Sequence, residues 1–173
     1  MKKQERFERG AGILLPIFSL PSDYGIGSFD EAAYSFVDFL QEAGQKYWQI
    51  LPLNPTGYGD SPYQSTCAFA GNPYFIDLEL LCKDGLIEKS FVEDFKWEDS
   101  AKVDYDNLSK NRYTVLRQAY SVFKSNIPKD FEEFKAKNSF WLKDYALYFA
   151  IKDNQGGKAF DCWEEGYKLR EPN

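Results

Sequence analysis

The sequence predicts an α/β fold that begins with a strand–helix–strand unit. A continuous apolar run at residues 12–18 is typical of a strand buried on both faces. A helical pattern follows it, and a second short apolar run extends from Tyr47 to Leu51, directly before Pro52. Because strand, helix and strand follow one another within about forty residues, they form a βαβ unit with two parallel strands.

The helix of this unit is predicted from its ends and from its apolar spacing. Ser28 stands three residues before Glu31, which is the spacing of a capping box with Ser28 as the N-cap. We expect Gly44 to end the helix, because glycine is favoured just past a C-cap. Apolar side chains recur at 4-3-4-3 spacing and share one face: Phe29, Ala33, Phe36, Leu40 and Ala43.

Residues 52–73 show no periodicity and are rich in proline and glycine. A loop of this length in a compact domain is usually functional or disordered. Tyr58, Tyr63 and Phe69 give the loop apolar surface to pack, which favours function over disorder. The loop also follows the C-terminal end of a predicted strand, where parallel α/β folds place their ligands.

From residue 77 onward the spacing predicts a mainly helical region. Asp77 is expected to be a helix N-cap, and Trp48 and Trp141 are expected in the core. Two strands with one crossover leave both sheet edges open, so we expect the chain to be the N-terminal part of a larger protein. The expected helices cover residues 77–83, 90–95, 104–125, a short stretch around Phe131 and Phe134, and 139–153. The helix at 104–125 has apolar side chains at 3-4-3 spacing: Tyr113, Leu116, Tyr120 and Phe123.

Composition excludes several classes of function. The 173 residues include 21 basic and 27 acidic side chains, a net charge of −6, which disfavours nucleic acid and anionic membranes as partners. The absence of histidine excludes Ser-His-Asp and Cys-His catalysis and any imidazole metal site. No apolar run approaches the roughly 20 residues that span a bilayer. Three cysteines without a C-x-x-C pair argue against a zinc site and favour the cytoplasm.

The densest motif is the segment from Leu51 to Ser65, LPLNPTGYGDSPYQS, and it resembles the 4-alpha-glucanotransferase family, glycoside hydrolase family 77. The resemblance extends over nearly the whole chain. Further matching segments are RGAGILLP at 9–16, YGIGSF at 24–29, NPYFIDL at 72–78, WLKDYAL at 141–147, and the stretch from Trp163 to Pro172.

The resemblance implies a fold and a reaction. The family has a (β/α)8 TIM barrel with helical insertions, so residues 1–76 would start the barrel and residues 77–173 would form a mainly helical, truncated subdomain. The family transfers a segment of an α-1,4-glucan to the 4-hydroxyl of another glucan or of glucose. It uses two carboxyl groups in a retaining mechanism with a covalent glycosyl-enzyme intermediate, and it needs no cofactor.

The same resemblance places the catalytic carboxylates on later barrel strands, beyond residue 173. We therefore assign no catalytic residue to this chain, and expect it to be inactive without the missing C-terminal barrel portion. Its implied contribution is the donor side of a cleft for α-1,4-glucans and maltodextrins. Tyr63 matches the family tyrosine that stacks on the sugar beside the cleaved bond, with Ser61, Asp60 and Tyr58 as further candidate contacts.

Other interpretations compete with a transferase fragment. Tyr58 and Tyr63 are also compatible with a non-catalytic malto-oligosaccharide-binding module. The acidic surface and the helices after residue 77 are compatible with a helical interaction protein. A related hydrolase of starch-type glucans is a variant of the first interpretation, because only the competition between acceptor sugar and water separates the two activities.

Overall fold

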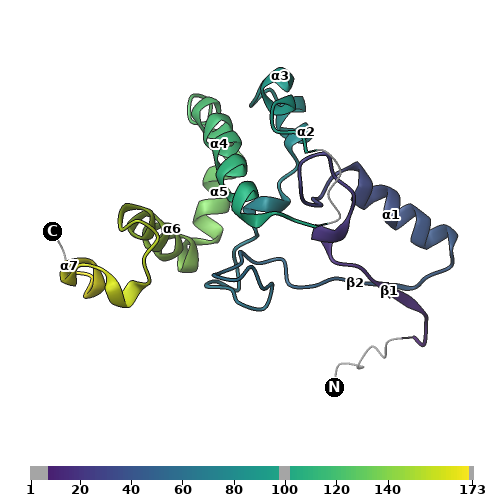
Figure 1. Cartoon of the computed structure of the whole chain (residues 1–173), viewed down its shortest axis with the longest axis horizontal. Coiled ribbons are helices and arrows are strands. Elements are labelled where there is room, and N and C mark those ends of the chain that lie inside the picture. The colour runs from purple at the N-terminus through teal and green to yellow at the C-terminus, as the bar shows by residue number, and fades with distance from the viewer. Residues whose placement is uncertain (1–7, 98–101, 172–173) are drawn as a thin grey trace. The chain divides into compact units, whose positions relative to one another are not determined.

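The computed structural model describes residues 8–97 and 102–171. The chain divides into two compact units, Met1–Asn126 and Ile127–Asn173, and each is described by itself. Figure 1 shows the order of the elements along the chain. The expected division into a barrel start at residues 1–76 and a helical subdomain at residues 77–173 is a different one, and it stays a prediction.

The predicted βαβ unit is present in the first unit. Strands β1 (Gly12–Leu14) and β2 (Tyr47–Gln49) pair in parallel, with Gly12 opposite Tyr47 and Leu14 opposite Gln49, and α1 (Glu31–Glu42) connects them (Figure 1). The Phe36 ring of α1 meets the Trp48 ring of β2 edge-on, with 5.0 Å between the ring centroids. This contact packs the helix against the sheet.

The expected strand at residues 12–18 is shorter and more exposed than the apolar run suggested. Pro16 has no backbone N–H to extend the pairing. After it the chain turns into the 3-10 helix η1 (Ile17–Ser19). Leu14 is 55% exposed, so the expectation of burial on both faces is wrong for this strand. Parallel strands are buried only where elements cover both faces of the sheet.

The capping box predicted at Ser28 is also wrong. Asp30 is the N-cap of α1, and its carboxylate accepts hydrogen bonds from the backbone N–H groups of Ala32 and Ala33 at 2.9 and 3.3 Å. Ser28 is buried, and its hydroxyl donates to the same carboxylate at 2.9 Å. Asp30 therefore caps the helix, and Ser28 orients the cap. The predicted end is confirmed, because Gly44 follows the helix with a φ of 67°.

Short helices and one long helix complete the first unit. They are η2 (Pro73–Phe75), α2 (Leu78–Lys83), α3 (Lys89–Glu93) and α4 (Tyr105–Phe123). Asp77 caps α2 as predicted, with Oδ1 accepting from the Glu79 N–H at 2.8 Å. The predicted 3-4-3 pattern on α4 does not mark its most buried side chains, since Tyr113 and Tyr120 are exposed. The buried positions of α4 are Leu108, Arg112, Val115 and Ala119.

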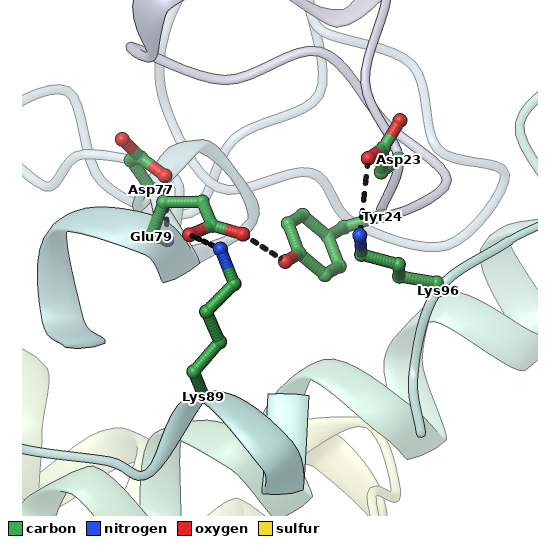
Figure 2. Close-up of polar contacts among 6 residues, drawn as sticks. All are labelled: Asp23, Tyr24, Asp77, Glu79, Lys89 and Lys96. Carbon is green, nitrogen blue, oxygen red and sulfur yellow. Dashed lines mark hydrogen bonds and ion pairs between the residues drawn. The ribbon is translucent and has the colours of Figure 1, made fainter. Parts of the chain in front are cut away.

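The segment between β1 and α1, residues 15–30, is called here the first connection. Its Tyr24 hydroxyl donates to Glu79 of α2 at 2.5 Å, and Lys89 of α3 pairs with the other Glu79 oxygen at 3.3 Å (Figure 2). Burial and this hydrogen bond raise the pKa of the Tyr24 hydroxyl, and the same bond holds the pKa of Glu79 below its ordinary value. Lys96 pairs with Asp23 at 3.5 Å (Figure 2).

Two further contacts hold the first connection in place. The backbone N–H of Trp97 donates to the Asp23 carbonyl at 2.7 Å, and the Trp97 indole lies so close to Gly25 that a Cβ there would enter the ring. Gly25 also has a φ of 79°, so this position requires glycine for two reasons. Arg112 is buried and donates to the carbonyls of Ile76 at 3.0 Å and Tyr24 at 3.4 Å.

The second unit consists of α5 (Lys129–Lys137), α6 (Ser139–Asn154), the 3-10 helix η3 (Phe160–Cys162) and α7 (Glu165–Lys168). Among the residues described up to 171, the buried side chain of this unit is Trp163, whose ring lies 5.2 Å from that of Tyr148 and whose Nε1–H donates to the Lys158 carbonyl. Trp141, expected in the core, is only half-buried. In the described residues no helix combines the length and the apolar character needed to cross a lipid bilayer.

Candidate functional site

The loop predicted at residues 52–73, called here the aromatic loop, has no helix or strand between residues 52 and 72. Its centre consists of two successive β-turns. In the first, the Asp60 N–H donates to the Gly57 carbonyl at 3.2 Å, and Gly59 has the positive φ, 87°, that a type II turn needs. In the second, the Gln64 N–H donates to the Ser61 carbonyl at 3.1 Å.

A hydrogen bond closes the two turns into one double turn, residues 57–64. The Gly57 N–H donates to the Gln64 carbonyl at 2.9 Å. Pro62 occupies the second position of the second turn, where its fixed φ is favoured. The sequence of this segment therefore determines its local shape, because proline and glycine occupy the positions where the turns require them.

The double turn brings together all four residues that the sequence marked as candidate sugar contacts. Tyr58 is fully exposed at the second position of the first turn, and Tyr63 is 72% exposed at the third position of the second turn. Asp60 and Ser61 form the junction between the turns. The hydroxyl oxygen of Ser61 accepts from the Tyr63 N–H at 3.4 Å, so Ser61 also takes part in fixing Tyr63.

Asp60 is the strained residue of this site. Its φ of 54° lies in the left-handed region, which Asp tolerates better than most residues. Partial burial, and then the negative charge of Asp106, raise the pKa of its carboxyl group. The rings of Tyr74 and Tyr105 lie 6.4 Å apart between centroids. Burial, and then the charge of Asp60, raises the pKa of Tyr105, and burial, Tyr113 and Asp60 raise that of Tyr74 to about 12.

The base of the aromatic loop is closed by the Asn54 side chain and by a backbone hydrogen bond. Both hydrogen bonds donated by the Asn54 Nδ2 measure 3.0 Å, one to the Ala68 carbonyl and one to the Ala70 carbonyl. The Asn72 N–H donates to the Leu53 carbonyl at 2.8 Å. Local sequence does not mark Asn54 as a site residue, because an asparagine before a proline is an ordinary turn residue and its partners lie 14 and 16 positions along the chain.

This geometry can bind a polyhydroxylated ring. An exposed tyrosine offers a flat apolar face together with a hydroxyl that stays in water, and a sugar ring has apolar C–H faces and hydroxyl edges. Asp60 and Ser61 supply carboxylate and hydroxyl groups beside the rings. Among the described residues, no three or more His, Cys, Asp or Glu side chains are grouped so as to hold a metal ion.

Comparisons with known proteins agree on one family. The model of glycoside hydrolase family 77, described as 4-alpha-glucanotransferase, matches residues 15–173. A 4-alpha-glucanotransferase from Clostridium butyricum is 46% identical over 155 residues, which cover 89% of this chain and 32% of that protein. One from Streptococcus pneumoniae is 47% identical over 160 residues, which cover 91% of this chain and 32% of the relative.

A solved structure gives the same result. The amylomaltase from Streptococcus agalactiae, in complex with acarbose, superposes with a TM-score of 0.89 at 40% sequence identity. The match covers 95% of this chain and 34% of that chain. The chain thus spans about a third of the length of the curated relatives it matches. The model match over most of its length shows that the chain belongs to the 4-alpha-glucanotransferase family, glycoside hydrolase family 77.

Proposed function

We propose that this chain contributes the donor side of the glucan cleft in a 4-alpha-glucanotransferase. In this proposal β1, α1 and β2 start a (β/α)8 barrel, and the aromatic loop lies at the carboxyl end of β2, where barrel enzymes bind substrate. The observation that carries the proposal is the presentation of Tyr63, which is 72% exposed and fixed by a proline-containing turn. Its ring would stack on a glucose unit of an α-1,4-glucan.

The other residues of the double turn would orient the sugar. Asp60 and Ser61 would form hydrogen bonds with its hydroxyl groups, and Tyr58 would contact a glucose unit further along the glucan. Partial burial and the charge of Asp106 raise the pKa of the Asp60 carboxyl group, and in its ionised form this group would accept hydrogen bonds from sugar hydroxyls. The cytoplasmic location likewise stays a prediction from the cysteine pattern.

Catalysis would need groups that we do not assign to this chain. A retaining transfer requires a carboxylate nucleophile and a second carboxyl group as acid and base, about 5–5.5 Å apart. The missing C-terminal barrel portion would supply both. Incubation of this chain with maltotriose should therefore return maltotriose unchanged on chromatography. A ladder of longer maltodextrins would contradict this assignment.

Binding is the direct test of the site. We expect the chain to bind acarbose in isothermal titration calorimetry, and Tyr63→Ala to weaken the affinity by about tenfold or more. Tyr34→Ala is the matched control, because Tyr34 is a 68% exposed tyrosine on α1, outside the aromatic loop. An equal loss in both variants, or none in Tyr63→Ala, would remove Tyr63 from the site. Binding together with a natural end of the protein at Asn173 would support a non-catalytic binding module instead.

A further inference from the structure

We propose that Asn54 is a positioning residue that holds the double turn in its sugar-binding conformation. The inference rests on the proposed function and adds a residue that does not itself touch the sugar. One side-chain amide donates both of its hydrogens across the base of the loop, to the carbonyls of Ala68 and Ala70, each at 3.0 Å. Asn54 thereby connects the outgoing limb of the loop, which leads into the double turn, to the returning limb, which leads out of it.

The neighbours of Asn54 explain why a side chain is needed at this point. Pro55 follows it and has no N–H, so the backbone of the outgoing limb cannot donate to the returning limb there. The backbone bond from Asn72 to Leu53 closes the base one step earlier, and the next backbone closure is the bond from Gly57 to Gln64. Between these two closures Asn54 supplies a cross-connection through its side chain.

The cross-connection made by Asn54 affects binding because it determines how often the loop adopts the conformation that can bind the sugar. A tyrosine that stacks on a sugar must be held in place before the sugar arrives, or part of the binding energy is spent on ordering it. If loss of the cross-connection leaves the double turn in its binding conformation about a fifth of the time, the dissociation constant rises about fivefold. The effect would reach the sugar through the contact residues of the double turn, Tyr63 above all.

Two variants and one control test the inference. Asn54→Asp keeps the shape of the side chain but puts a carboxylate oxygen in place of the Nδ2 that faces two carbonyl oxygens, and Asn54→Ala removes the donors without adding charge. Asn111→Asp makes the same change of charge on α4, where the Asn111 amide donates to the Asn107 side chain at 2.9 Å. Each is made in the full 173-residue chain.

The first measurement needs no ligand. We expect backbone NMR order parameters of residues 55–67 to fall from about 0.85 toward 0.6 in both Asn54 variants, and to stay unchanged in Asn111→Asp. Unchanged order in the Asn54 variants would overturn the inference. A fall that extends through β1, β2 and α4 would overturn it as well, because Asn54 would then support the fold as a whole.

The second measurement is a double-mutant cycle with acarbose as the probe. Asn54→Ala should raise the dissociation constant about fivefold in the wild-type background and by a smaller factor in the Tyr63→Ala background, where less of the remaining affinity depends on the double turn. Additive losses would overturn the inference, because Asn54 would then act independently of Tyr63. If the wild-type chain does not bind acarbose at all, the proposed function fails, whereas the order parameters still decide whether Asn54 holds the loop.

Discussion

The two segments that follow β1 and β2 have opposite characters. The first connection is largely buried. Side chains from α2, from Lys96 after α3, and from α4 hold it through Tyr24, Asp23 and the carbonyl that receives Arg112. The aromatic loop is held mainly by its own turns and by Asn54, and it exposes Tyr58 and Tyr63. The first connection thus contributes to stability, and the aromatic loop exposes side chains to solvent.

This comparison predicts a clear order of effects on stability. Substitutions that release the first connection should lower the free energy of unfolding of the first unit. Truncation of the exposed tyrosines of the aromatic loop should leave that free energy nearly unchanged and alter mainly binding.

Arg112→Met should be the most destabilising change. It leaves the carbonyls of Ile76 and Tyr24 without their donor, at an expected cost of about 2–4 kcal/mol. Burial lowers the pKa of Arg112 to about 10, so removal of the charge recovers part of this cost. Urea denaturation measures the change, with Arg117→Met on the exposed side of α4 as the control. Equal midpoints for the two variants would show that Arg112 does not hold the first connection.

Tyr24→Phe should cost about 0.5–1.5 kcal/mol, the net value of one hydrogen bond. The variant keeps the buried ring and removes only the hydroxyl that donates to Glu79. The same urea experiment at neutral pH provides the number. A variant as stable as the wild type would mean that solvent satisfies Glu79 equally well.

The Tyr24–Glu79 pair also predicts how stability depends on pH. The pKa of Glu79 is lowered in the folded state, so its contribution is present above the ordinary value of 4.5 and is lost as the pH falls through the folded pKa. The pKa of Tyr24 is raised, so stability is lost as the pH rises above its ordinary value of 10.0. Both slopes should flatten in Tyr24→Phe when unfolding is followed across these two ranges. Slopes identical to those of the wild type would contradict this coupling.

Two glycines of the aromatic loop form a matched pair with a smaller effect. Gly59 has a φ of 87° and Gly71 does not have a positive φ, although an added Cβ would meet open space at either residue. Gly59→Ala should therefore lower the free energy of unfolding by about 1 kcal/mol, and Gly71→Ala should leave it unchanged or raise it slightly. Thermal melts of the two variants decide this. A destabilised Gly71→Ala would show that space, and not backbone conformation, is limiting.

Tyr58→Ala should have the smallest effect on stability, within about 0.5 kcal/mol, because a fully exposed side chain has little packing to lose. A melt of this variant next to the wild type tests the expectation. A large drop in the melting temperature would show that Tyr58 stabilises the loop. It would argue against a role in sugar binding.

Local rules explain what the sequence could predict. The turn and cap residues Gly44, Asp77 and Pro62 act on neighbours within a few positions, so the helix ends and the aromatic loop could be predicted from spacing alone. The end of α1 and the cap of α2 are confirmed on this basis. Tyr58 and Tyr63 could be marked as exposed candidates for the same reason.

Contacts between distant segments explain what was missed. Ser28 had the right spacing for a cap, but Asp30 caps the helix and Ser28 is buried beside it. Arg112 is charged and would ordinarily be assigned to the surface. It is buried because carbonyls 36 and 88 residues away accept its hydrogen bonds, and no local pattern contains that information.

The position of Trp97 against Gly25 gives the protein an internal optical reporter. Of the four tryptophans, Trp48 and Trp97 lie in the first unit and Trp141 and Trp163 in the second. The indole of Trp97 lies against the first connection, so release of that segment would move the ring into water and shift its emission to longer wavelength. In a chain in which the other three are replaced by phenylalanine, fluorescence would follow the opening of this one segment without any attached dye.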